Sequence, residues 1–177
     1  MTNTNSKKND ALLTDLFSTK GDNVKKALEK IPSQGNAKMI IPLLKTYKSW
    51  ENDGDIQNKI AHILGELKTE SAIPELIEAL EDPEFDAERA MIVSTFWHSG
   101  LYPVSDVDVL VRHAIRGDYF VSLEVLTVIE NIETQIDNQL LQDALFDIDE
   151  FLEEYPDAPH SELLNQLKEV ITRFYNQ

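Results

Sequence analysis

The sequence predicts an all-α protein made of repeated helical hairpins, and three observations support this fold class. The chain has 177 residues, a length that fits one domain with a buried core. Apolar residues recur at the spacing of one helix face over most of the chain. The same apolar pattern also returns when the sequence is shifted against itself, which is typical of repeat proteins.

The clearest hairpin covers residues 55–82. Its first helix is marked by apolar residues at the i, i+4, i+7, i+8 and i+11 positions: Ile56, Ile60, Ile63, Leu64 and Leu67. Ile73, Leu76, Ile77 and Leu80 mark the second helix. Pro74 fits the first turn of that helix, where its missing N–H would have no intrahelical partner.

This hairpin has counterparts along the chain. A shift of 32 residues towards the N-terminus aligns Ile41-Pro42 with Ile73-Pro74, so that an I-P-x-L motif recurs. A shift of 65 residues towards the C-terminus aligns a second apolar set. That set is Val121, Val125, Leu126, Ile129 and Ile132. Weaker matches over residues 87–116 complete about four predicted hairpins.

Residues 106–111 allow two interpretations. Their partial polar–apolar alternation fits a half-buried strand. Pro103, the S-x-x-D pattern of Ser105 and Asp108, which resembles a capping box, and the repeat register favour a helix. We therefore predict a helix.

The two ends are predicted to differ from the repeats. Residues 10–18 suit a short helix, and residues 159–175 suit a helix that caps the stack. Residues 1–9 are polar and are predicted to form a disordered tail. The prediction is thus one domain over residues 10–177.

The best repeat has V/I-x3-I-A-x2-L-G-E-L in its first helix and A-I-P-x-L-I-x-A-L in its second. This pattern resembles the HEAT-repeat superfamily, and among its members the short bacterial HEAT-like repeats of phycobilisome lyase-type proteins. The resemblance implies a right-handed α-α superhelix, a HEAT-like solenoid, that binds proteins. The chain departs from the family where an Arg is common, because it has Lys25, Gln57 and Ser122 there. Tetratricopeptide repeats share the period of 34 and are kept as an alternative for the fold, although their Trp, Gly and Tyr positions do not align.

Composition excludes several functions. The chain has no cysteine, which excludes disulfides, cysteine-ligated metals and thiol nucleophiles. Its net charge of −16 argues against nucleic-acid binding, which depends on clustered Lys and Arg. No secretory signal is recognisable, and no apolar run reaches the roughly 18 residues of a membrane span, so we expect a cytoplasmic protein without membrane contact.

The charge is uneven along the chain. Residues 1–48 hold nine Lys and four acidic residues, a net charge of +5, whereas residues 49–177 carry −21. The basic end fits an acidic partner or the acidic end of another copy. We expect a monomer or a weak homo-oligomer.

A search for catalytic or cofactor motifs finds none. His62, His98, His113 and His160 are scattered, and no phosphate-binding glycine loop occurs. Residues 82–88 have the alternating acids of a calcium loop, but Ala87 and Val93 replace its required Gly and Glu. We interpret them as a turn between repeats. The sequence therefore predicts no enzyme activity, no cofactor and no metal.

The fourth repeat carries an acidic stripe with three interpretations. Asp143, Asp147, Glu150 and Glu154 follow helical spacing opposite the apolar face. The stripe fits a solvated helix face, a docking surface for a basic partner, or a site of weak cation binding.

HEAT-like proteins usually place their second helices on the concave side, and this predicts a binding face. The outward row of residues 75, 78, 79 and 82 has equivalents at 43, 46, 47 and 50, at 109, 112, 113 and 116, and at 140, 143, 144 and 147. Its candidate binding residues are Tyr47, Trp50, Glu78, Asp82, Arg112, His113, Arg116, Asp143 and Asp147. Alternatively, Trp50 packs on a neighbouring repeat, and Arg112 and Arg116 neutralise nearby acids.

The predicted function is therefore a non-enzymatic protein-interaction module for a basic or amphipathic partner segment. A HEAT-like nucleic-acid enzyme would need a cationic groove, which the charge opposes. A lyase-like or ligand-binding role would need an aromatic cavity, for which Phe96, Trp97, Tyr102 and Tyr119 are candidates. An antitoxin-like inhibitor that masks a basic enzyme surface is a further variant of the binding function.

Overall fold

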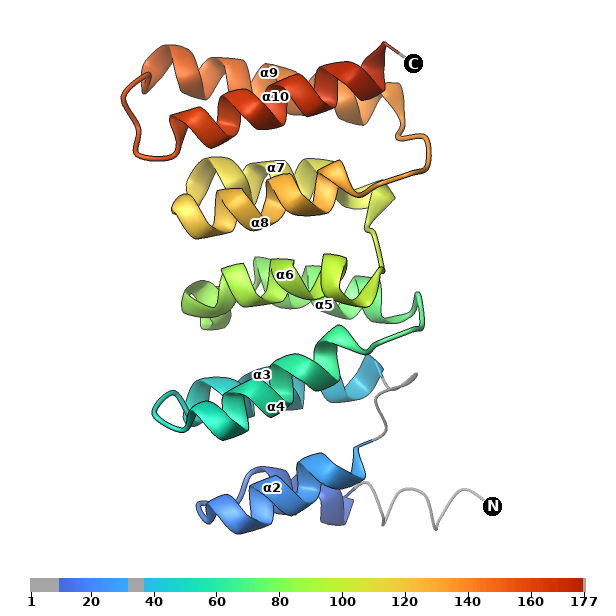
Figure 1. The fold of residues 1–177 in the computed structure, drawn as a ribbon, viewed down its shortest axis with the longest axis vertical. Helices are drawn as coiled ribbons and strands as arrows, with labels where there is room; N and C mark the ends of the chain where they lie inside the picture. Colours follow the sequence, from blue (N-terminus) through green and yellow to red (C-terminus); the bar gives the residue numbers. More distant parts are fainter. Residues whose placement is uncertain (1–9, 32–36, 177) are drawn as a thin grey trace. The chain divides into compact units, whose positions relative to one another are not determined.

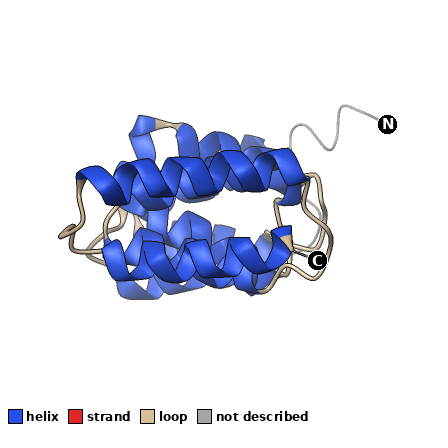
Figure 2. Ribbon diagram, turned by 90° about the horizontal axis from the view of Figure 1, so that it is seen from above, coloured by secondary structure: helices blue, strands red, loops and turns tan. Residues whose placement is uncertain are grey.

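The computed structural model describes residues 10–31 and 37–176, and these residues form helices and loops without a strand (Figure 2). The predicted tail, residues 1–9, lies outside the described residues. The chain divides into two compact units, Met1–Glu88 (unit 1) and Arg89–Gln177 (unit 2).

Unit 1 starts with a helix over residues 10–16. It continues through α2 (Gly21–Lys30), the short 3-10 helix η1 (Ala37–Met39), α3 (Ile40–Ser49), α4 (Gly54–Gly65), α5 (Ala72–Glu81) and the 3-10 helix η2 (Pro83–Glu88). α2 packs against α4, and α3 packs against both α4 and α5 (Figure 1). Each helix therefore contacts the element next to it or the one after that.

Unit 2 repeats this arrangement and ends in two longer helices of 17 and 15 residues. It contains α6 (Arg89–Ser99), the 3-10 helix η3 (Val104–Asp106), α7 (Val107–Arg116), α8 (Tyr119–Glu130), α9 (Asn138–Glu154) and α10 (Ser161–Tyr175). α6, α8 and α10 pack in succession, and α7 packs on α9. The α7–α8 turn and the α9–α10 turn lie at the same end of the unit (Figure 1, left).

The helices follow the predicted periodicity. All five apolar residues that marked the first helix of the best repeat are buried, and so are Leu76, Ile77 and Leu80 of the second. The predicted end helices are present at residues 10–16 and 161–175, and residues 107–116 form a helix rather than a strand. The prediction of an all-α chain is confirmed for the described residues.

Helix pairing differs from the prediction. The consecutive helices that pack closely are α3 with α4, α7 with α8 and α9 with α10. The predicted hairpins join the other neighbours, such as α4 with α5, so the close pairs are offset by one helix. Two of the close pairs have short turns, since residues 50–53 join α3 to α4 and residues 117–118 join α7 to α8.

One local prediction is wrong. Ser105 does not cap α7, because the N-cap residue is Asp106 without a side-chain capping bond, and the carboxylate of Asp108 is engaged by Arg112 instead. Residues 83–88, interpreted as a turn between repeats, lie between α5 and α6 in the sequence and form the 3-10 helix η2, which Phe85 interrupts with non-helical backbone angles. The side chain of Phe85 is completely buried. Apolar burial therefore holds this segment in place in addition to its backbone hydrogen bonds.

Aspartates begin three of the helices. The side chain of Asp53 accepts from the backbone N–H of Ile56 at 3.2 Å, that of Asp118 from Val121 at 3.0 Å, and that of Asp137 from Gln139 at 2.8 Å. Each bond satisfies an N–H that lacks an intrahelical partner. These caps set where α4, α8 and α9 begin.

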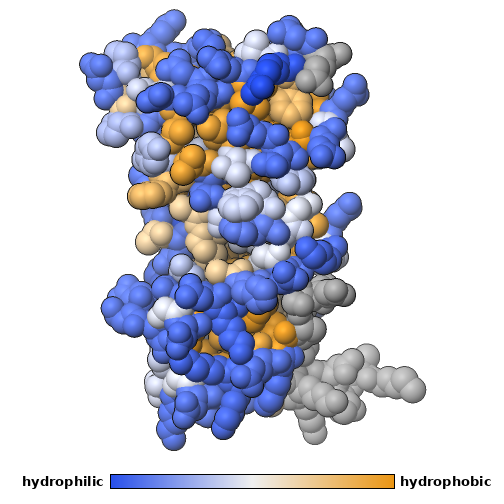
Figure 3. All heavy atoms as spheres, in the orientation of Figure 1, coloured by the Kyte–Doolittle hydropathy of each residue, from blue (hydrophilic) through white to orange (hydrophobic). Residues whose placement is uncertain are grey.

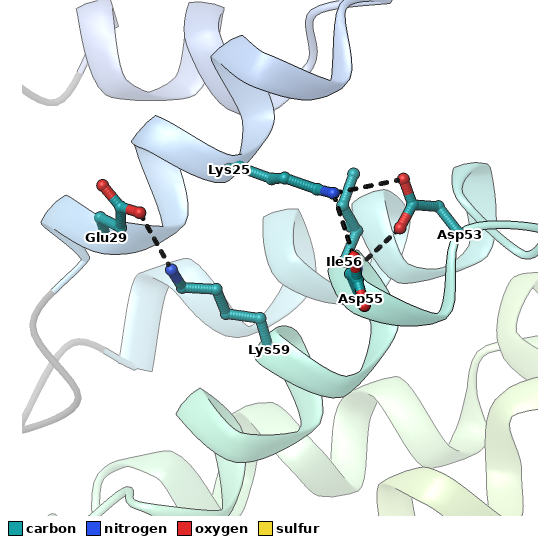
Figure 4. A network of polar contacts seen from close by, with 6 residues as sticks. All are labelled: Lys25, Glu29, Asp53, Asp55, Ile56 and Lys59. Carbon is teal, nitrogen blue, oxygen red and sulfur yellow. Dashed lines mark hydrogen bonds and ion pairs between the residues drawn. The ribbon is translucent and has the colours of Figure 1, made fainter.

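A polar network joins α2 to α4 around the first of these caps (Figure 4). Lys25 Nζ lies 3.8 Å from Asp53 Oδ2 and 3.4 Å from Asp55 Oδ2, and Lys59 Nζ lies 3.4 Å from Glu29 Oε1. The partners are largely exposed, so each pair contributes at most about 1 kcal/mol. The network adds polar contacts between the two helices and contributes little to stability.

The turn between α7 and α8 depends on Gly117. A Cβ atom at this position would lie 2.6 Å from the carbonyl oxygen of His113 and 2.8 Å from Cβ of Val121. The following residue, Asp118, is already the N-cap of α8. A side chain at position 117 would therefore separate the two helices.

Within the described residues, the structure contains no helix that is both long enough and apolar enough to cross a membrane.

Candidate functional site

The predicted binding residues are divided between the two units. In unit 1, Tyr47 and Trp50 lie at the end of α3, Glu78 lies on α5 and Asp82 follows α5. In unit 2, Arg112, His113 and Arg116 lie on α7, and Asp143 and Asp147 lie on α9. Because α3 packs on α5 and α7 packs on α9, each half of the row lies on two adjacent helices.

The row is only partly a surface. The residues of the predicted outward row that are buried are Leu43, Thr46, Ala79, Val109 and Ala144. Each helix has neighbours on more than one side, so the core extends onto the face that was predicted to be open. The prediction of a continuous outward row is therefore wrong at these five positions.

Trp50 lies beside a pocket of unit 1 and also packs on α2. Gly21, the first residue of α2, faces its indole ring, since a Cβ there would lie 3.5 Å from Cζ3. The pocket has a volume of about 410 Å³ and is lined by Leu16, Phe17, Ser18, Thr19, Thr46, Ser49 and Trp50. Trp50 thus packs against α2. This agrees with the alternative interpretation, in which Trp50 packs on a neighbouring repeat.

Arg112 is engaged within its own helix. Its Nη1 donates to Asp108 Oδ2 at 2.7 Å, across one turn of α7. This supports the alternative in which Arg112 neutralises a nearby acid. Arg116, four residues further along, is exposed near the α7–α8 turn.

The acidic stripe of α9 faces solvent for most of its length. Asp143, Glu150 and Glu154 are exposed and Asp147 is half-buried, whereas Leu141 and Ile148 on the opposite side are buried. Phe146 lies among these acids and is 66% exposed. The stripe is therefore an acidic face with an uncovered aromatic side chain in it.

A second feature adjoins the end of this stripe. A pocket of about 480 Å³, here called the α9–α10 pocket, opens where α9 ends. It is lined by Phe151, Glu154, Tyr155, Pro156, Asp157, Ala158 and Pro159. The rings of Phe151 and Tyr155 are 5.1 Å apart, centroid to centroid. Aromatic and proline surfaces thus form its walls, and two carboxylates lie on its lining.

His160 holds the α9–α10 turn in place. Its ring is largely buried, packs against Phe151 at a centroid distance of 5.5 Å, and contacts the carbonyl oxygen of Ile115 through Nε2 at 3.1 Å. A carbonyl oxygen only accepts hydrogen bonds, so Nε2 is the protonated nitrogen. The turn is therefore tied to the end of α7 as well as to its own helices.

The electrostatics of this region are strongly negative. Residues 117–167 hold thirteen Asp and Glu and neither Lys nor Arg, and six of these acids lie on α9. Four of the six, Asp149, Glu150, Glu153 and Glu154, are at the C-terminal end of the helix, where the helix dipole is itself negative. The Tyr155 hydroxyl donates to Glu154 Oε1 at 2.8 Å, and this bond and the carboxylate charge raise the pKa of Tyr155.

Further aromatic side chains are exposed in unit 2. Tyr119 and Phe120 begin α8, with their rings edge to face at 5.8 Å, and Phe120 is 64% exposed. On the face drawn in Figure 3, apolar patches interrupt the hydrophilic surface over the helices of unit 2. The aromatic surface of this unit is thus not confined to the pocket.

The four aromatics that were candidates for a ligand cavity differ in environment. Phe96 is completely buried, whereas Trp97 is half-buried and donates from Nε1 to Glu124 Oε2 at 2.7 Å. Tyr102 is half-buried, and Tyr119 is 48% exposed at the start of α8. Phe96 therefore belongs to the core, and Trp97 serves to join α6 to α8.

Across residues 10–31 and 37–176, no group of three or more His, Asp or Glu side chains is arranged to hold a metal ion.

Comparison with protein-family models, with curated proteins and with solved structures finds no match to this chain.

The α9–α10 pocket was not predicted from the sequence. The acidic stripe leads to it, but Tyr155 and Pro156 lie between the predicted helices and have no periodicity to mark them, and Pro159 was predicted to begin the last helix. The sequence did contain one signal for this site. Residues 117–167 lack Lys and Arg, and the acids of this segment are followed by Phe151, Tyr155 and Pro156.

Proposed function

We propose that the chain is a non-enzymatic protein-interaction module that binds a basic, amphipathic segment of a partner protein. The binding surface combines the exposed acidic face of α9 with the α9–α10 pocket. The observation that carries the proposal is the exposed Phe146 among Asp143, Asp147 and Glu150. An apolar anchor within charges of one sign complements a helix with apolar residues on one face and cations beside them.

The cost of keeping this surface uncovered supports the proposal. An exposed aromatic side chain forgoes burial that contributes roughly 1.5–3 kcal/mol, and acids at a helix C-terminus each lose about 0.3–1 kcal/mol. Features that lower the stability of the fold, and that no other part of the structure requires, are expected at functional sites. A basic partner would offset both effects.

We also propose that the two units form a right-handed HEAT-like solenoid. Packing of every second helix within each unit, as for α6, α8 and α10, supports it, as does the recurrence of the I-P-x-L motif at residues 41–44 and 73–76. A crystal structure or small-angle scattering of the full chain tests this arrangement. A compact bundle in either measurement would overturn it.

Titration of the full chain with a synthetic amphipathic peptide tests the binding function. The peptide is about 18 residues long, which gives five helical turns, with Leu on one face and Lys and Arg on the other. The comparison peptide has Glu in place of every Lys and Arg. We expect saturable binding of the basic peptide only, weakened by salt because exposed charges are screened.

Matched variants then locate the interaction. Asp143→Asn with Asp147→Asn and Glu150→Gln should weaken binding roughly tenfold, because each exposed ion pair contributes about 0.2–1 kcal/mol. The control removes three exposed acids of unit 1 with Glu51→Gln, Glu66→Gln and Glu70→Gln. Equal losses in the two triple variants would mean that only the net charge matters, and would overturn the proposed surface.

A further inference from the structure

We propose that the α9–α10 pocket binds the side chain of one arginine, which anchors the basic partner segment. The inference rests on the proposed function for the source of that arginine. The choice of arginine rests on the aromatic, proline and acidic residues that line the pocket.

The walls of the pocket suit a flat cation. Tyr155 supplies an exposed ring that Phe151 supports from one side at 5.1 Å, and Pro156 and Pro159 add apolar surface on the following turn. Ring faces attract a cation that lies within about 6 Å of the centroid, and a planar guanidinium also stacks on them. The half-exposed ring of Tyr155 is open to such a ligand.

The charged residues among those that line the pocket are both acids. Glu154 and Asp157 are exposed acids on its lining, and α9 ends at Glu154. The last carbonyl groups of a helix lack intrahelical donors and form the negative end of its dipole. A guanidinium therefore finds two carboxylates and the exposed ring of Tyr155 together at the negative end of a helix.

Arginine fits these groups better than lysine does. Its guanidinium presents five N–H donors in a plane, so that it can meet a carboxylate with two hydrogen bonds while its face lies on a ring. An ammonium group is a compact, strongly hydrated charge and gains less from the flat walls. An uncharged side chain would not offset the negative charges of Glu154 and Asp157.

The probe for the test is N-acetyl-arginine amide, added at millimolar concentration to the full chain labelled with ¹⁵N. We expect saturable chemical-shift changes in the amides of residues 151–160. N-acetyl-lysine amide should produce smaller changes at the same sites, and N-acetyl-citrulline amide, which has the same shape without the charge, should produce almost none. Equal changes with citrulline, or changes spread evenly over the acidic surface, would overturn the proposal.

Variants separate the contribution of the ring from that of the charge. Tyr155→Phe keeps the ring and should retain binding, whereas Tyr155→Leu should weaken it roughly fivefold, in the range of a cation–π contact. Asp157→Asn should weaken it as well. Phe120→Leu and Glu133→Gln change an exposed aromatic and an exposed acid elsewhere in unit 2, and both should leave the titration unchanged.

The two proposals fail in different ways. If the amphipathic peptide binds and the arginine probe leaves residues 151–160 unchanged, the proposed function stands and the arginine site is wrong. If the arginine probe binds at the pocket and the peptide does not bind, the site stands and the proposed function is wrong. Circular dichroism of each variant, expected to match the parent chain, verifies that the fold is retained.

Discussion

The indole Nε1 of Trp97 donates a hydrogen bond of 2.7 Å to Glu124 Oε2, and this bond joins α6 to α8 in unit 2. The two residues are 27 positions apart in the sequence, and both side chains are half-buried. Indole offers a donor and no acceptor, so a carboxylate is a well-matched partner. The contact shows that a polar pair, as well as apolar burial, sets how these two helices pack.

Glu124→Ala should lower the free energy of unfolding by about 1–2 kcal/mol, because a hydrogen bond to a charged group is lost and the indole N–H is left without its acceptor. Glu124→Gln retains an acceptor oxygen and should lower it by less. Urea denaturation followed by far-ultraviolet circular dichroism measures both values. If Glu124→Ala is as stable as the parent chain, the bond does not hold α6 to α8.

Gly117→Ala should destabilise the chain by about 1–3 kcal/mol, the range for forcing extra atoms into a packed site. The new Cβ would overlap the backbone oxygen of His113, which cannot move without disturbing the end of α7. Gly54→Ala is the matched control. Nothing lies within 4 Å of a Cβ at that position, at the start of α4, and alanine should stabilise the helix by about 0.5–1 kcal/mol. Thermal unfolding of the two variants should therefore shift in opposite directions.

The Asp53 side chain has two roles that substitution can separate. Asp53→Asn keeps the cap on Ile56 and loses the ion pair with Lys25, so we expect a loss of no more than about 1 kcal/mol. Asp53→Ala also removes the cap and should cost about 1 kcal/mol more. Equal stabilities of the two variants in chemical denaturation would show that the cap contributes nothing.

Tyr47 makes stability depend on alkaline pH. Burial, and secondly the charge of Glu88, raise the pKa of its phenol above the ordinary value of 10.0. The folded state therefore holds this proton more tightly than the unfolded state does. The resulting stabilisation is fully present below pH 10 and is lost as the pH rises through the folded-state pKa.

Glu88→Gln tests the second cause of that shift. It should lower the pKa of Tyr47 towards the ordinary value without reaching it, because burial remains the larger effect. The phenolate absorbance of the variant, compared with that of a chain that also carries Tyr47→Phe, isolates this group. An unchanged titration would show that Glu88 does not act on Tyr47.

Periodicity predicted the helices because their core positions follow one face. Ile56, Ile60 and Leu64 are buried as their spacing requires, and the helix over 107–116 was found despite a strand-like start. Pairing was not predicted correctly, because the apolar face of a helix contacts several other helices, including the second one along the chain, as α8 contacts α6 and α10. The spacing of the apolar residues alone does not say which neighbour lies closer.

The candidate site was predicted only in part, for a related reason. The acidic stripe of α9 follows from helical spacing, and Asp143 and Glu150 are exposed as that spacing implies. The pocket beyond it depends on how the turn after Tyr155 folds back, and on the contact between His160 and a carbonyl group 45 residues earlier. Such a contact has no signature in local sequence.

That contact also makes the pocket depend on a distant part of unit 2. His160, in the turn that follows Pro159, reaches the carbonyl oxygen of Ile115 near the end of α7. Ile115 is not among the residues that line the pocket. A substitution at the end of α7 would therefore be able to change the shape of the pocket without altering any residue of its lining.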